Sequence, residues 1–163
     1  LNEFLQSTSN PTVYAAGDAA QMGPPLTPVA SYDAQLVAAN LLEGNHRSPD
    51  YRVVPSVVFT IPPMASVGLS EAQAKEAGKT FRVNSSKASD WFTARQNAEP
   101  SYGYKVLIEE ETDRVIGAHL VGPHVEEVIN LFSLAMRYDL TAADLKSTSF
   151  AYPTSTSDIS YML

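Results

Sequence analysis

A chain of 163 residues with 44% hydrophobic and 18% charged residues is long enough for one hydrophobic core, or for one core plus part of a second domain. Its net charge of −7 argues against a nucleic-acid or anionic-membrane partner, and no apolar run is long enough to span a membrane. Cysteine is absent, so these residues hold no disulfide, thiolate metal site or cysteine nucleophile, and we expect a cytoplasmic protein.

The opening residues read as the end of a larger domain. The chain begins with Leu1 rather than Met, so we expect a piece of a longer protein. Residues 13–16, VYAA, predict a short buried strand, which a tight turn at Gly17 and Asp18 ends. A strand followed by a long helix is typical of an α/β domain.

That helix is predicted from about Pro28 to Glu43. Thr27 is expected to cap it, because Pro28 suits the first helical position, where its missing N–H has no partner to lose. Gly44 is the expected stop, and residues 45–50, NHRSPD, form the predicted linker. We therefore divide the chain into residues 1–48 and 49–163.

The second part predicts an α+β domain, an antiparallel sheet with helices on one face. Strands are expected at 53–60, 81–89, 102–110 and 114–122, the last two forming a hairpin, while 61–68 is expected to be extended but irregular. A capping box at Ser70 and Gln73 predicts a short helix that ends at Gly78.

The clearest helix follows Pro123. Its apolar residues fall on one stripe, with two glutamates in the first turn, where the helix dipole favours negative charge. The stripe comprises Val125, Val128, Ile129, Phe132 and Met136. Another short helix is expected to start at Thr141 and Asp144.

Several stretches resemble one family in collinear order. They are VYAAGDAA at 13–20, LTPVA at 26–30, VVFTIPPMASVGLSEAQAKEAG at 57–78 and GYKVLIEEETDRVIGAHLVGPHVEEVINLFSLAMRYDL at 103–140. The chain is similar to the C-terminal part of the pyridine nucleotide–disulfide oxidoreductases, which include glutathione reductase, dihydrolipoamide dehydrogenase and mercuric reductase. The resemblance implies the last strand and helix of an FAD-binding domain, followed by a dimerisation domain.

The resemblance also implies an FAD-facing segment. The carboxylate at the position of Asp18 would accept hydrogen bonds from the ribityl chain, and Gly17 would let the backbone come close. The LTPVA stretch, with Leu26, Thr27 and Ala30, would aim a helix N-terminus at the flavin ring and stabilise negative charge there. A plain strand-ending turn at 17–18 and a plain helix start at 27–28 remain the alternative interpretations.

The C-terminal AYPTSTSDISYML resembles the family segment that carries a His-Pro-Thr motif and, five residues after the histidine, a glutamate. Pro153 and Thr154 match, but Tyr152 stands at the histidine position and Ser157 at the glutamate position. A free phenol ionises near pH 10, against about 6.5 for imidazole, so ordinary glutathione- or lipoamide-type proton relay is not expected. Tyr152 is a candidate catalytic hydrogen-bond donor to substrate or flavin, or a packed aromatic residue at a dimer interface.

Other candidates have plainer interpretations. Ser155 and Asp158 fit a helix cap, with a catalytic acid as the alternative. Trp91 and Phe92 fit either a core or a dimer contact. The three histidines lack ligand-like spacing, so no metal site is expected.

The resemblance implies a homodimer formed through residues 49–163, with the sheet and helix of 103–140 at the interface. The parent would transfer electrons from NAD(P)H through FAD to a disulfide or another small-molecule acceptor. These 163 residues alone would be inactive and would hold no FAD, because the Gly-rich fingerprints and the cysteine pair of the family do not occur in them. The alternative is a stand-alone dimerisation or interaction module without redox activity.

Overall fold

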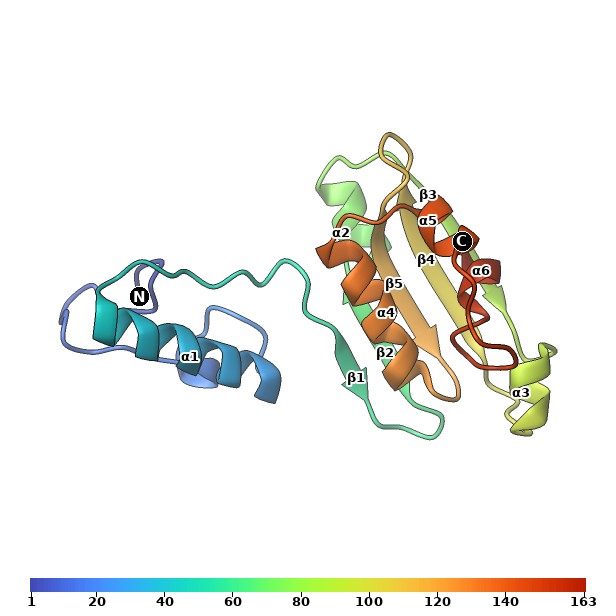
Figure 1. Cartoon of the computed structure of the whole chain (residues 1–163), viewed down its shortest axis with the longest axis horizontal. Helices are drawn as coiled ribbons and strands as arrows, with labels where there is room; N and C mark the ends of the chain where they lie inside the picture. Colours follow the sequence, from blue (N-terminus) through green and yellow to red (C-terminus); the bar gives the residue numbers. More distant parts are fainter. The chain divides into compact units, whose positions relative to one another are not determined.

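The computed structural model describes all of residues 1–163, which divide into two compact units, Leu1–Val54 and Pro55–Leu163. Figure 1 shows both units along the chain. No helix in either unit combines the length and the apolar character that a membrane crossing requires.

The first unit is built on one long helix. A single 3₁₀ turn, η1 (Gly17–Ala19), precedes α1 (Thr27–Glu43). The strand predicted at 13–16 is wrong, since only Tyr14 forms an isolated antiparallel bridge, with Gln6. A strand needs neighbours to pair its backbone groups, and residues 1–54 supply only this one bridge.

Helix α1 begins one residue earlier than its sequence indicates. Leu26 is extended, and its carbonyl oxygen accepts the N–H of Ala30 at 3.0 Å, so Leu26 is the cap residue and no side chain caps the helix. The predicted Thr27 cap is therefore wrong, because Thr27 is already helical. Gly44, with φ +84°, follows the last helical residue as expected.

Asn40 ties the segment after α1 back to the helix. The side chain is buried; its amide donates to the carbonyl oxygen of Arg47 at 2.8 Å, and its oxygen accepts the N–H groups of His46 and Arg47 at 3.1 and 3.0 Å. These bonds replace the hydrogen bonds to water that the amide loses when it is buried.

The second unit is an α+β domain with a five-stranded antiparallel sheet, which confirms the predicted fold class. The order across the sheet is β1-β2-β5-β4-β3. The strands are β1 (Ser56–Val58), β2 (Met64–Gly68), β3 (Phe81–Lys87), β4 (Gly103–Glu109) and β5 (Val115–Val121). The predicted β4–β5 hairpin is confirmed, whereas 64–68 is a regular strand rather than irregular chain.

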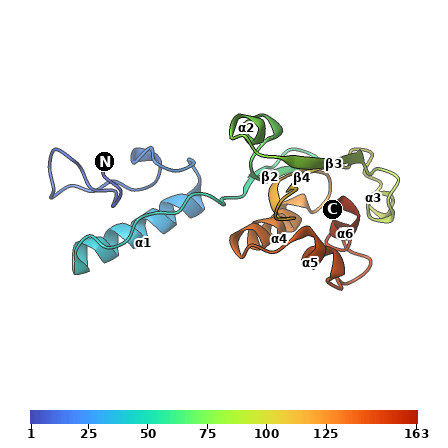
Figure 2. The same ribbon diagram turned by 90° about the horizontal axis from the view of Figure 1, so that it is seen from above.

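Most helices lie on one face of this sheet as predicted, but the short α2 (Glu71–Glu76) lies on the other side. The others are α3 (Phe92–Gln96), α4 (Val125–Arg137), α5 (Ala142–Ser147) and α6 (Ile159–Met162). Figure 2 shows α4, α5 and α6 on one side and the short α2 on the other. The core lies between the sheet and α4, whose predicted stripe is buried except for Met136, which is partly exposed.

Two capping boxes are present, and the one predicted at Ser70 and Gln73 is confirmed. Ser70 accepts the N–H of Gln73 at the start of α2, and Thr141 accepts the N–H of Asp144 at the start of α5. In each box the third residue of the helix bonds back to the cap residue, so two N–H groups gain partners.

Candidate functional site

The segment predicted to face FAD is held against α1. Gly17 has φ +60°, and its N–H donates to Oδ2 of Asp33 at 2.9 Å. A Cβ at Gly17 would lie 2.7 Å from the Cβ of Ala30, closer than real side chains approach. Only glycine therefore allows η1 to sit this tightly on the first turns of α1.

The other predicted FAD residues lie around this contact. Asp18 is exposed, and its carboxylate makes no hydrogen bond within the chain, so its oxygens are free to accept from a ligand. Leu26 is the cap residue of α1 and Thr27 its first residue. The N–H groups of a helix's first turn have no intrahelical partner, so this end favours negative charge. These residues fit the sugar-like chain and the anionic edge of a flavin.

Asp33 and Tyr51 hold this segment in place, and the sequence pattern did not single them out. Asp33 is fully buried, and its Oδ1 accepts the hydroxyl of Tyr51 at 2.7 Å while Oδ2 holds Gly17. Burial raises the pKa of Tyr51 above its ordinary value, and the hydrogen bond to Asp33 raises it further. One signal was present in the sequence: Asp33 interrupts the buried stripe of Val29, Leu36 and Asn40 at helical spacing.

Asp158 anchors the C-terminal segment to the second unit. Only 6% of it is exposed, and its Oδ2 accepts hydrogen bonds from Thr93 and, at 3.1 Å, from Tyr102. Burial raises the pKa of Asp158, and the two hydrogen bonds oppose that rise. The predicted role as a helix cap is wrong, because this side chain makes no capping bond to α6.

The pair of side chains that does make reciprocal hydrogen bonds lies one residue earlier in the sequence. Oγ1 of Thr154 accepts the N–H of Ser157 at 3.2 Å, and the N–H of Thr154 donates to Oγ of Ser157 at 3.3 Å. The hydroxyls of the segment therefore stabilise its own turn, but the pair is Thr154 and Ser157 rather than Ser155 and Asp158. Burial decides this shift, because the carboxylate of Asp158 is engaged inside the domain.

Tyr152 lies at the surface next to α3. It is 71% exposed, and its ring lies 6.2 Å from the ring of Phe92, which is also exposed. The adjacent Trp91 instead packs within the unit, with ring distances of 5.5 to 5.9 Å to its neighbours. Those neighbours are Tyr102, Tyr104 and Tyr161. Trp91 is thus a contact inside the domain, while Phe92 and Tyr152 form an aromatic pair that solvent reaches.

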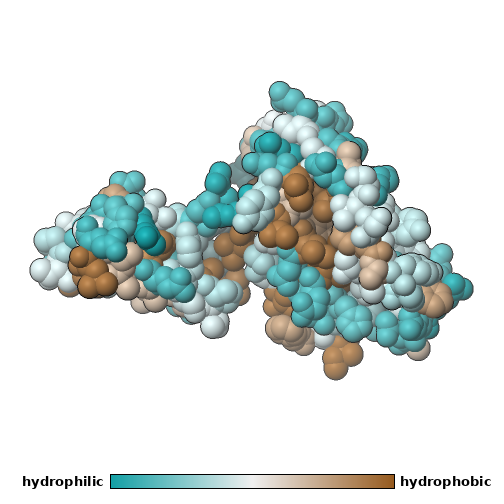
Figure 3. Space-filling view, viewed as in Figure 1, coloured by the Kyte–Doolittle hydropathy of each residue, from teal (hydrophilic) through white to brown (hydrophobic).

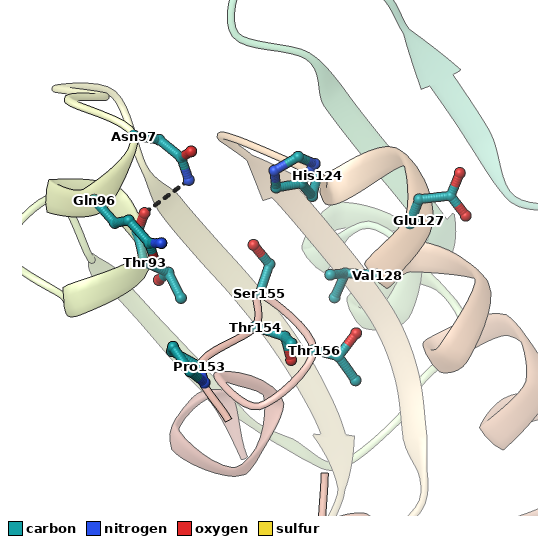
Figure 4. A pocket seen from close by; sticks show the side chains of 10 residues that line it. All are labelled: Thr93, Gln96, Asn97, His124, Glu127, Val128, Pro153, Thr154, Ser155 and Thr156. Atoms are coloured by element: carbon teal, nitrogen blue, oxygen red, sulfur yellow. Dashed lines mark hydrogen bonds between the residues drawn. The ribbon is translucent and has the colours of Figure 1, made fainter. Parts of the chain in front are cut away.

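A pocket of about 390 Å³ lies beside this pair, between α3, the start of α4 and residues 153–156. Eight of its ten lining residues have polar side chains, as Figure 4 shows. The sequence analysis missed this pocket, because its residues come from three separated segments. The histidines do not cluster: no group of three or more His, Asp or Glu side chains is placed to hold a metal ion.

Comparison with known proteins shows which family has this architecture. Residues 54–162 match the family model of the pyridine nucleotide-disulphide oxidoreductase dimerisation domain. Among solved structures, the HOCl-induced flavoprotein disulfide reductase RclA from Escherichia coli superposes with a TM-score of 0.87 at 26% identity. That likeness covers 99% of this chain and 37% of the RclA chain.

The curated relatives fall into two length classes. A 19.7 kDa protein in the mercuric resistance operon of Staphylococcus aureus is 52% identical over 164 residues, covering all of this chain and 91% of the relative. Mercuric reductase of S. aureus is 40% identical over 94% of this chain, which spans only 28% of that enzyme. Pig mitochondrial dihydrolipoyl dehydrogenase is 37% identical over 90% of this chain, again 28% of the enzyme. The chain belongs to the pyridine nucleotide–disulfide oxidoreductase family and carries its dimerisation domain.

Proposed function

We propose that this chain supplies the subunit interface of an FAD-dependent, NAD(P)H-using oxidoreductase that works as a homodimer in the cytoplasm. The observation that carries the proposal is the family match over residues 54–162, which is almost all of the second unit. Residues 49–163 would form the dimerisation domain, and residues 1–48 the last part of the FAD-binding domain.

The second unit exposes apolar side chains that suit an interface. Leu134 and Tyr138 on the last turns of α4 are 52% and 70% exposed, although the opposite stripe of α4 is buried. The connection between β1 and β2 adds Phe59 and Ile61, and Figure 3 shows hydrophobic surface projecting there. Exposed large apolar side chains of this kind are available to be covered when two copies associate.

In such a dimer the first unit would contact the flavin. FAD, when bound, would supply the two-electron chemistry that links NAD(P)H to the acceptor. Asp18 would accept hydrogen bonds from the ribityl hydroxyls, and the first turn of α1 would stabilise negative charge at the flavin ring. Asp33 would keep Gly17, and with it Asp18, in place through the 2.9 Å bond.

Tyr152 would lie beside the flavin site of the partner subunit. Its exposure and its contact with Phe92 support a role at a surface that becomes covered on assembly. There the phenol would donate a hydrogen bond to substrate or flavin, or would pack as an aromatic contact. Exchange of Tyr152 for Phe separates the two roles, because it removes the hydroxyl and keeps the ring.

A chimera tests the proposal. The 28% of S. aureus mercuric reductase that this chain matches is replaced by residues 1–163. We expect a yellow, dimeric protein that retains FAD. A chimera that folds but stays colourless after FAD is added would contradict the flavin-facing role of residues 1–48.

One observation favours a second candidate, a dimerisation module without redox activity. The S. aureus relative at 52% identity has nearly the same length as this chain, so a chain of about this size occurs in a mercuric resistance operon. A module of this kind would pair with itself or with a full-length reductase of the family. Mixing this chain with S. aureus mercuric reductase and measuring masses by native mass spectrometry tests that pairing.

A further inference from the structure

We propose that the cavity between α3, the start of α4 and residues 153–156 binds a small neutral molecule with several hydroxyl groups, such as a polyol or a sugar. We call it the Ser155 pocket. Its volume of about 390 Å³ lies within the range of small-molecule sites. The proposal concerns the second unit alone and does not depend on FAD.

Ser155 is the central observation. It is only 8% exposed, yet its hydroxyl makes no hydrogen bond within the chain. In Figure 4 that hydroxyl points into the open space between Asn97 and His124. The hydroxyl oxygen is not sealed from solvent, so it can donate to and accept from a molecule in the cavity. A hydroxyl held in this way is matched by a ligand that both donates and accepts.

The other polar groups of the pocket also have free hydrogen-bonding capacity. Asn97 uses its amide nitrogen to donate to the carbonyl oxygen of Thr93 at 2.9 Å, which leaves its own oxygen free. The side chains of Gln96 and Thr156 make no hydrogen bond within the chain. Hydroxyl and carboxamide groups each donate and accept, as the hydroxyls of a polyol do.

Charge argues for a neutral ligand. No Lys or Arg lines the pocket, so an anion would meet only the partial positive charge at the start of α4. The one carboxylate, that of Glu127, points away from the opening in Figure 4, so a cation would gain little. No group of three His, Asp or Glu side chains is placed for a metal ion. Val128 and Pro153 complete the lining with apolar surface for the C–H groups of such a ligand.

The same geometry provides a clean variant. Because the hydroxyl of Ser155 has no partner in the chain, Ser155→Ala removes a ligand contact without breaking a bond of the fold, so the unfolding midpoint should not fall. His124 has φ +62°, and Asn tolerates that conformation better than Ala does. His124→Asn therefore tests the opposite wall of the pocket at little cost to the backbone.

The test is an NMR titration of the 163-residue chain with ribitol and, separately, with glucose. We expect saturable shifts confined to residues 93–97, 124–128 and 153–156. Ser155→Ala should weaken binding at least tenfold with the unfolding midpoint unchanged. The matched control is Ser31→Ala, which removes an exposed serine hydroxyl on α1, and it should bind as the unaltered chain does.

Parallel titrations with inorganic phosphate and with acetate decide the ligand class. Shifts at these residues with phosphate or acetate, but not with ribitol or glucose, would show an oxyanion site and overturn the proposal. No saturable shift with any probe, or equal binding by Ser155→Ala and the unaltered chain, would also overturn it.

Discussion

The hydroxyl of Tyr102 donates a hydrogen bond to Oδ2 of Asp158 across 3.1 Å, and both residues are buried. Thr93 donates to the same oxygen, so one carboxylate joins α3, the residue before β4 and the C-terminal segment. The segment that looks like a polar tail in the sequence is therefore part of the folded domain, and it places Tyr152 and the Ser155 pocket.

Asp158→Ala should destabilise the second unit by about 3 kcal/mol, because two buried donors lose their acceptor. Asp158→Asn should lower the free energy of unfolding by less, since the amide oxygen can accept from both Thr93 and Tyr102. Urea unfolding followed by the fluorescence of Trp91 measures both variants. Equal stability of Asp158→Ala and the unaltered chain would show that the carboxylate does not anchor the segment.

Asp158 should also make stability depend on pH. Its pKa is raised in the folded state by burial, so the folded protein holds this proton at a pH where the unfolded chain has released it. The stability that this proton contributes is fully present below the ordinary Asp pKa. It is lost as the pH rises from there through the raised pKa of Asp158 in the folded protein.

The difference in unfolding free energy between the unaltered chain and Asp158→Asn should accordingly decrease over that window. Four other carboxyl groups have lowered pKa values and act in the opposite direction, but they occur in both proteins and cancel in the difference. They are Glu71, Glu109, Asp113 and Asp144. A difference that increases with pH would contradict the buried position of Asp158.

Gly17→Ala should loosen the turn that presents Asp18. The alanine would combine the strain of φ +60° with a 2.7 Å approach to the Cβ of Ala30, for a total of about 2–4 kcal/mol. Gly78→Ala is the matched control, since Gly78 has φ +67° but no atom within 4 Å of the added Cβ. Hydrogen exchange of the amides near each site, in α1 and in α2, should show the larger loss of protection for Gly17→Ala.

Tyr51→Phe should destabilise the first unit by about 1–2 kcal/mol, because Oδ1 of buried Asp33 loses its donor. The helical circular dichroism signal during urea unfolding measures this loss. Burial and Asp33 raise the pKa of Tyr51 above its ordinary value, so its stabilising effect should persist through neutral pH and disappear only in strong alkali. An alkaline absorbance titration in which Tyr51 ionises together with the exposed tyrosines would contradict this arrangement.

Features set by neighbouring residues could be read from the sequence. The Ser70–Gln73 capping box, the helix start at Thr141 and the stripe of α4 depend on residues within a few positions of each other, and the structure confirms them. Family resemblance added what local patterns lack, namely the identity of the second unit as the dimerisation domain of this family.

Features set by distant residues could not be read in this way. The partners of Asp158 lie 65 and 56 positions away, so its spacing to Ser155 suggested a cap that burial overrides. The strand expected at 13–16 failed for a related reason, because strand formation depends on partners and not on VYAA alone. The Ser155 pocket joins three separated segments, and no single segment of the sequence marks it.

The central claim, that this chain associates through its second unit, is tested most directly by sedimentation equilibrium of residues 1–163 and of two variants. Leu134→Glu places a charge on the exposed end of α4, and Leu42→Glu places the same charge on an exposed leucine of α1. We predict a species of twice the 17.6 kDa chain mass for the unaltered chain and for Leu42→Glu, and a dissociation constant at least tenfold larger for Leu134→Glu. A chain that remains monomeric at every concentration measured would contradict the claim.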